Sequence, residues 1–194
     1  MNVRDLEPKG VWNHFEDLNA VPRPSKKEEK VISFMENFAK SLNLDYEIDA
    51  VGNVIVRKPA SPGMENRRAV VLQSHLDMVH QKNGDTDFDF DTQGIQSYID
   101  GDWVKAKGTT LGADNGMGVA AIMTVLSSSE IAHPPLEALF TIDEESGMTG
   151  AHNLQGGVLK GEILMNLDTE DDDELSIGCA GGIDTNVNWN YSER

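Results

Sequence analysis

Basic residues and cysteines are scarce in this chain of 194 residues. Lys and Arg together number 16 against 33 Asp and Glu, which gives a formal net charge of -17. This balance argues against a nucleic-acid partner or an anionic membrane surface, because both require clustered cations. The single cysteine, Cys179, excludes an intramolecular disulfide and agrees with a reducing compartment. We predict that it is a packing residue rather than a reactive thiol.

Long apolar runs are also absent from the sequence. No stretch approaches the ~20 apolar residues that a membrane-spanning helix requires. Residues 1–10 carry mixed charges without the apolar region of a signal peptide. We therefore expect a cytoplasmic protein with no membrane partner, long enough to bury a sizeable core.

Two helices are predicted near the N-terminus. Apolar residues recur at helical spacing over 7–21, and Pro22 then stops the first helix. The sequence from Ser25 to Glu28 has the pattern of a capping box, in which both side chains accept hydrogen bonds from free amides at a helix start. The second helix is expected to continue to Leu42 with its apolar residues on one face.

Apolar, β-branched runs predict the strands of a sheet. Hairpins are expected around the turns at Gly52 and Gly101. Further strands are expected over 69–72, 136–142, 163–167 and, beginning near residue 179, toward the end of the chain; a helix is expected over 119–126. The alternation of strands and helices indicates an α/β fold, with a mixed, mainly parallel sheet flanked by helices.

Candidate functional side chains follow the predicted strands, where apolar runs give way to Gly, Asp and Asn. They are His75, Asp77, Asp114, Glu144, Glu145 and Asp168. Open α/β sheets bind their ligands at the carboxyl ends of the strands. The sequence therefore predicts most of a two-metal hydrolase centre at this edge.

Spacing suggests roles for the first three of these residues. An Asp two residues after a His on a strand lies on the same face, so Asp77 could orient a metal-binding His75. By itself such a pair is weak evidence, since it often caps a turn. Asp114 lies among small residues that let the backbone approach a cofactor closely, and its carboxylate could bridge two cations. Its alternative role is an N-cap for the following helix.

The remaining carboxylates add to this prediction. Glu144 and Glu145 would repel each other at the rim of a core unless a cation or a shared proton relieved them. Successive side chains of a strand diverge, so one could bind metal while the other takes a proton from water. Asp168 repeats the strand-end pattern, although it could also belong to a solvated turn.

A further nitrogen ligand is missing from this set. A two-metal centre of this kind normally needs a second His, and no residue between 168 and 194 supplies one. The four other histidines are expected in surface or loop positions: His14, His80, His133 and His152.

Four segments carry motifs shared with one known family. They are Ser74-His75-Leu76-Asp77-Met78-Val79, Gly108-Thr109-Thr110-Leu111-Gly112-Ala113-Asp114-Asn115-Gly116, Glu144-Glu145-Ser146-Gly147-Met148 and Gly178-Cys179-Ala180-Gly181-Gly182-Ile183-Asp184. With them the chain resembles, over essentially its whole length, the cytosolic Xaa-His dipeptidases (aminoacyl-histidine dipeptidases, peptidase D). These are zinc peptidases grouped with aminoacylases and carboxypeptidases. Asn115-Gly116 favours the dipeptidases over the related tripeptidases, which tend to carry Asp and Lys there.

The resemblance implies a pair of zinc ions and their ligands. One zinc would be held by His75, Asp114 and Asp168. The second would be held by the shared Asp114, by Glu145 and by a distant C-terminal His. Co²⁺ or Mn²⁺ would also suit histidine and carboxylate ligands.

The resemblance also implies the catalytic roles. Asp77 would orient His75, and Glu144 would be the general base for hydrolysis of Xaa-His and other unblocked dipeptides. Relatives often have a cis peptide bond just after the bridging aspartate, so Asp114–Asn115 is expected to be one.

Family members are much longer than this chain, with a lid and dimerisation domain inserted after a strand near Cys179. We therefore expect residues 1–194 to be the N-terminal portion of a di-zinc peptidase catalytic domain. The lid and the C-terminal part would be absent and hydrolysis impaired, whereas full-length members would be homodimers. The alternatives are an inactive fragment that binds metal or a partner, and a related aminopeptidase or deacylase.

Overall fold

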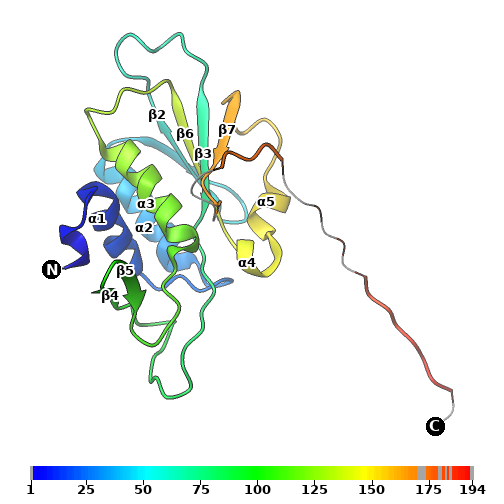
Figure 1. Cartoon of the computed structure of the whole chain (residues 1–194). Helices are drawn as coiled ribbons and strands as arrows, with labels where there is room; N and C mark the ends of the chain where they lie inside the picture. The colour runs from blue at the N-terminus through cyan, green and yellow to red at the C-terminus, as the bar shows by residue number, and fades with distance from the viewer. Residues whose placement is uncertain (1, 170–173, 179–180, 182, 184, 193–194) are drawn as a thin grey trace.

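The computed structural model describes residues 2–169, 174–178, 181, 183 and 185–192. It contains one domain of helices packed on a sheet, from which the C-terminal segment extends away (Figure 1). In chain order the elements are η1 (Val3–Asp5), α1 (Lys9–Asn19), α2 (Glu29–Ser41), β1 (Asp45–Ile48), β2 (Val54–Lys58), β3 (Val70–His75), β4 (Ser97–Asp100), β5 (Trp103–Ala106), α3 (Ala113–Ser127), β6 (Leu136–Thr141), α4 (Glu144–Gly147), α5 (Thr149–Asn153) and β7 (Ile163–Asn166).

The main sheet has five strands in the order β1-β2-β6-β3-β7. Strand β3 is parallel to both β6 and β7, and β2 is antiparallel to β1 and β6. Four strands therefore run in one direction and only β2 opposes them. This confirms the predicted α/β fold with a mixed, mainly parallel sheet. Strands β4 and β5 form the second predicted hairpin, apart from the main sheet.

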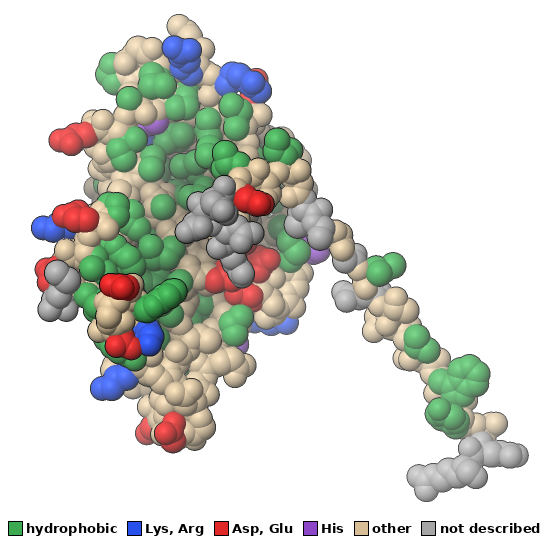
Figure 2. All heavy atoms as spheres, viewed as in Figure 1, with side chains coloured by type: hydrophobic (Ala, Val, Ile, Leu, Met, Phe, Trp, Pro, Cys, Tyr) green, Lys and Arg blue, Asp and Glu red, His purple; other side chains and the backbone are tan. Residues whose placement is uncertain are grey.

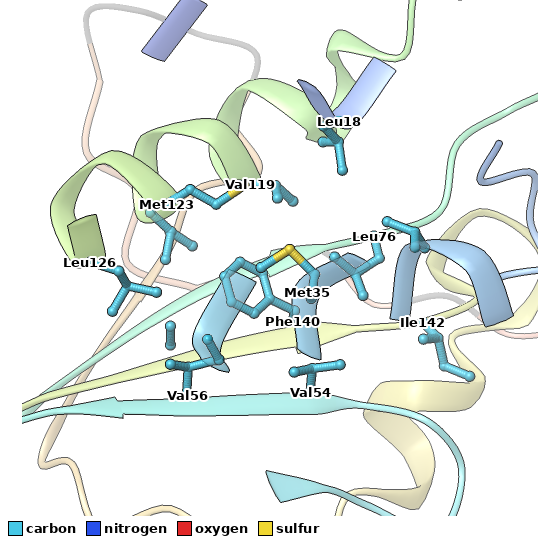
Figure 3. Close-up of a cluster of buried hydrophobic side chains, with 14 residues drawn as sticks. Leu18, Met35, Val54, Val56, Leu76, Val119, Met123, Leu126, Phe140 and Ile142 are labelled. Carbon is cyan, nitrogen blue, oxygen red and sulfur yellow. The ribbon is translucent and has the colours of Figure 1, made fainter. Parts of the chain in front are cut away.

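Side chains along the central strands point alternately to the two faces of the sheet, so each face has its own hydrophobic cluster. Val54 and Val56 of β2, with Phe140 of β6, pack against residues of α1, α2 and α3 in the larger cluster. Figure 3 shows these side chains pointing toward one another between the helices and the sheet. The intervening Ile55 and Leu139 face the other side, where residues 154–159 cover them. Burial on both faces explains the continuous apolar runs of these strands.

The start of α2 differs from the sequence prediction. Glu28 is its N-cap residue but makes no side-chain capping bond. Lys26 has a positive φ of 69°, and Ser25 lies beside Asp77, to which its hydroxyl donates a hydrogen bond of 2.7 Å. The predicted capping box is therefore wrong in its main bond. The Ser25 hydroxyl instead donates to a buried carboxylate that follows β3.

The end of the chain also differs from prediction. The described residues from 174 to 192 form no strand, and Cys179 lies outside the described residues. Val187, Trp189 and Tyr191 are all strongly exposed. Their alternating pattern favours a strand, but no strand pairs with the described residues of this segment, and a strand needs a partner for its backbone groups. Within the described ranges, no helix has the length and apolar character needed to cross a membrane.

Candidate metal centre

The carboxyl edge of the sheet gathers the predicted site residues. His75 is the last residue of β3, and Asp168 follows the end of β7 by two residues. Glu144 and Glu145 begin α4 just after β6, and Asp114 lies in the first turn of α3. Because β3, β6 and β7 are parallel, their carboxyl ends meet at one edge. Figure 2 shows acidic side chains gathered near α4, beside the base of the C-terminal segment.

The imidazole of His75 lies at the centre of this cluster. Its Nε2 atom is 3.0 Å from Asp114 Oδ1, 3.7 Å from Asp168 Oδ1 and 4.0 Å from Glu144 Oε2. His75 belongs to two groups whose ligand atoms all lie within 4.8 Å of one another. One contains Asp114 and Asp168, and the other contains Glu144 and Glu145. The first group brings together the three residues expected at one zinc site; that they bind a metal, and that Asp114 is shared between two ions, stay predictions.

Asp77 holds the other side of the His75 ring. The Nδ1 atom of His75 lies 3.2 Å from Asp77 Oδ1, and both side chains are buried. Carboxylate oxygens can only accept, so without a metal both ring nitrogens carry a hydrogen, and a cation bound at Nε2 would replace the hydrogen that faces the other acids. Asp77 also accepts hydrogen bonds from the amides of Glu144 and Glu145, at 3.0 and 3.3 Å. The geometry therefore fits the predicted orienting role and ties β3 to the start of α4.

The charges in the cluster are poorly balanced. Burial alone would lower the pKa of His75, but Asp77, Asp168 and Asp114 outweigh it and raise this pKa to about 9. Burial raises the pKa of Glu144 and of Glu145, and in both cases nearby carboxylates add to the rise. Among the described residues, no Lys or Arg forms an ion pair with any of these acids. Such a site favours a bound cation.

Glu144 and Glu145 are positioned by a helix rather than by a strand. Strand β6 ends at Thr141, and Asp143 then takes a positive φ of 48° before α4 begins. The prediction that the two side chains diverge as on a strand is therefore wrong in its geometry. The first amides of a helix have no partner within it, which is why those of Glu144 and Glu145 can bond Asp77.

The loop before α3 uses its glycines differently from the prediction. A Cβ atom at Gly112 would lie 2.5 Å from Arg23 Nη2, and one at Gly116 would lie 2.7 Å from the same atom. These glycines make room for a buried arginine, whereas the sequence suggested room for a cofactor. Gly112 stands at the assigned start of α3, but Asp114 and Asn115 have non-helical φ and ψ angles inside it, so the alternative role of Asp114 as an N-cap stays a prediction.

Asn115 is a site residue whose role the sequence does not reveal. Its side-chain Nδ2 atom donates to the Leu167 carbonyl oxygen at 2.9 Å and to the carboxylate of Asp168. Its oxygen accepts from the hydroxyl of Ser74. The peptide bond between Asp114 and Asn115 is cis, as the resemblance implied. Asn115 thus links the Asp114 loop to the ends of β3 and β7, through contacts too distant in sequence for a local motif to indicate.

The four other histidines belong to none of these groups, as expected, although His133 is buried in its loop and His14 is partly buried on α1. His14 Nε2 is 3.1 Å from Ser127 Oγ, and His133 Nδ1 is 2.8 Å from its neighbour's carbonyl oxygen. The ring of His80 packs edge-on against Phe90, and His152 is exposed on α5. No histidine besides His75 belongs to the metal-binding groups of the described residues.

Comparison with known proteins supports the resemblance found in the sequence. The chain is 51% identical over 186 residues to the cytosol non-specific dipeptidase of Escherichia coli, covering 96% of this chain and 38% of that protein. The structure of an aminoacylhistidine dipeptidase from Vibrio alginolyticus matches with a TM-score of 0.87 and 52% identity, over 89% of this chain and 35% of its own. A tripeptidase from Staphylococcus aureus, at 22% identity and a TM-score of 0.71, covers 84% of this chain and 44% of its own and shares the fold.

The chain therefore spans between a third and two fifths of the length of the two dipeptidases. The family model described as peptidase family M28 matches residues 53–177, which is more than half of the chain. This protein therefore belongs to peptidase family M28.

Proposed function

We propose that this protein takes part in the metal-dependent hydrolysis of dipeptides, including Xaa-His dipeptides. The observation that carries the proposal is the buried His75, whose Nε2 atom meets carboxylates from three other segments, none of which forms an ion pair with a Lys or Arg among the described residues. The names of the two similar dipeptidases support the substrate class, and the cytosol named for one of them supports a cytoplasmic location. The homodimer implied by the resemblance is part of this proposal.

The donor set fits a divalent transition metal. One imidazole nitrogen and several carboxylate oxygens suit Zn²⁺, Co²⁺ and Mn²⁺. His75, Asp114 and Asp168 would hold one ion, and Glu145 would contribute to a second. When bound, such ions supply Lewis-acid chemistry, which polarises a peptide carbonyl and lowers the pKa of water.

Glu144 is proposed as the general base. Its carboxylate lies beside the ligand groups, 4.0 Å from His75 Nε2, and burial raises its pKa toward the range useful for proton transfer. It can take a proton from water and later pass it to the leaving amine. Asp77 supports this role because it holds the backbone of Glu144 and the ring of His75 together.

An alternative is metal binding without hydrolysis. It is favoured by the single imidazole in the cluster, since the other described histidines lie elsewhere. A related aminopeptidase or deacylase would use the same residues with another substrate pocket.

These functions can be separated with the metal-free protein. The chain is dialysed against a chelator and reloaded with zinc, and the zinc per chain is measured together with hydrolysis of an Xaa-His dipeptide and of an N-acyl amino acid. We expect zinc binding and preferential dipeptide cleavage. Zinc binding without turnover supports the alternative, cleavage of the acyl substrate alone supports a deacylase, and the absence of zinc binding contradicts all three.

A further inference from the structure

Arg23 is a fully buried cation between α1 and α2 that the proposed chemistry does not use. Its Nη1 atom donates hydrogen bonds to the carbonyl oxygens of Leu76 and Asp77, at 3.0 and 3.1 Å. Its Nη2 atom donates to the carbonyl oxygen of Gly112. One guanidinium thus joins the chain that leaves β3 after His75 to the loop that carries Asp114.

Backbone contacts reinforce this junction. The amide of Met78 donates to the carbonyl of Arg23 at 3.1 Å, and Pro24 and Met78 form an isolated parallel bridge. The hydroxyl of Ser25 reaches the Asp77 carboxylate. The segment 23–25 therefore packs along the residues that follow His75 and is hydrogen-bonded to them.

The loop carrying Asp114 is shaped around the guanidinium. Gly112 and Gly116 flank Asp114, and a Cβ atom at either position would come within 2.5 or 2.7 Å of Arg23 Nη2. Even an alanine methyl group would displace the arginine or the loop. The position of the Asp114 segment is thus coupled directly to the position of Arg23.

Stability alone is a weak reason to bury this residue. Removing a guanidinium from water is costly, and apolar residues of similar volume often serve a core as well. Arg23 forms no ion pair among the described residues, and its Nη1 and Nη2 atoms donate to carbonyl oxygens, whereas its buried Nε has no partner there. The guanidinium differs from an ammonium in its rigid planar fork, which fixes several acceptors relative to one another. That property suits a residue that holds two backbone segments in register.

We propose that Arg23 is a positioning residue of the metal centre. It fixes the Asp114 loop against the end of β3, and so sets the separation between the His75 imidazole and the Asp114 carboxylate, which is 3.0 Å between Nε2 and Oδ1. This role rests on the proposed function, because it presupposes that His75 and Asp114 bind the same ion.

The main test is the metal affinity of Arg23→Lys and Arg23→Met. Zinc affinity is measured by competition with a coloured chelator, and visible absorption of the Co²⁺-loaded protein reports the ligand geometry. We expect a loss of affinity of roughly 10- to 100-fold, the usual effect of removing a residue that orients metal ligands. Lysine keeps the charge but lacks the fork, so it should restore little of the loss.

A second variant tests the junction from the side of the loop. Gly116→Ala keeps Arg23 but crowds its Nη2 atom, so it should lower metal affinity and change the Co²⁺ spectrum. In the Arg23→Lys background the same substitution should cost less. The matched control is Gly10→Ala, whose Cβ would lie 2.8 Å from a Thr124 methyl group between α1 and α3. Arg57→Lys, at the other end of the sheet, controls for replacing an arginine.

Folding of each metal-free variant is followed by circular dichroism and denaturant unfolding, so that lost stability is separated from lost affinity. If Arg23→Met does not fold, Arg23→Lys and Gly116→Ala decide the result. Folded variants that bind metal as tightly as the parent, with the same Co²⁺ spectrum, overturn the positioning role and leave the proposed function intact. If the unmodified chain binds no metal, the proposed function fails, and the role of Arg23 falls with it.

Discussion

The two ends of the central sheet handle their carboxylates in opposite ways. At the amino end of β6, Glu137 is almost fully buried and accepts hydrogen bonds from the amides of Lys160 and Gly161, at 2.6 and 2.7 Å. Arg57 Nε lies 3.3 Å from its other oxygen. Every oxygen of this carboxylate therefore has a protein donor, and Arg57 balances its charge.

At the carboxyl end, the acids outnumber their partners. Asp114, Asp168 and Glu144 converge on one imidazole nitrogen, and burial with mutual repulsion raises the pKa of Glu144. Folding alone would favour the arrangement at the other end, because crowded carboxylates repel one another when no cation lies between them. The contrast indicates that the carboxyl end is organised to hold a cation, which would supply the missing positive charge.

The largest difference is expected between two buried histidines at opposite ends. His75→Ala removes the nitrogen that the acids share, so metal affinity should fall by more than roughly 100-fold, beyond the usual effect of an orienting residue, and hydrolysis should be lost. His133→Ala, just before β6, is the matched control and should retain both. Zinc retained after gel filtration and dipeptide turnover measure the difference. Equal zinc content in the two variants would contradict the proposed centre.

A second comparison separates the two adjacent glutamates. Glu144→Gln keeps the shape of the side chain but cannot accept the proton, so kcat should fall by about 10²- to 10⁴-fold with zinc content preserved. Glu145→Gln should instead weaken metal binding, because Glu145 is proposed as a ligand. Steady-state kinetics at saturating zinc, with metal analysis of both variants, measure this. If Glu144→Gln loses zinc but its zinc-loaded fraction turns over normally, then Glu144 is a metal ligand and not the general base.

Local patterns predict much of the fold and the identity of the acids. The three long helices α1, α2 and α3, both hairpins and the buried strands follow from apolar periodicity and turn residues, which depend on neighbours in sequence. The strand-end positions of His75 and Asp168 follow in the same way, because the carboxyl ends of parallel strands meet at one edge.

Contacts between distant segments could not be predicted in this way. The capping pattern at Ser25 is real in sequence, but Asp77, 52 residues away, takes its hydroxyl. Arg23 sits between two prolines, which indicates a helix end, and nothing nearby shows that it reaches Gly112. The closest signal is the pair Gly112 and Gly116, whose small size suggests close approach without naming what approaches. The alternating pattern at the end of the chain also favours a strand, but its described residues form none, because a strand depends on pairing partners that a local pattern does not specify.

The smallest effect is expected at the balanced end of the sheet. Glu137→Gln keeps one accepting oxygen but replaces the other with an amide nitrogen, so either Arg57 or the amides of Lys160 and Gly161 lose an acceptor. The free energy of unfolding should fall by about 1.5–3 kcal/mol, the contribution of a hydrogen bond to a charged group. Urea unfolding of the metal-free protein measures it. Zinc affinity and kcat should be unchanged, because the substitution leaves the carboxyl edge intact. A loss of zinc affinity in this variant would show that the two ends are coupled through β6 and that the contrast between them is not local.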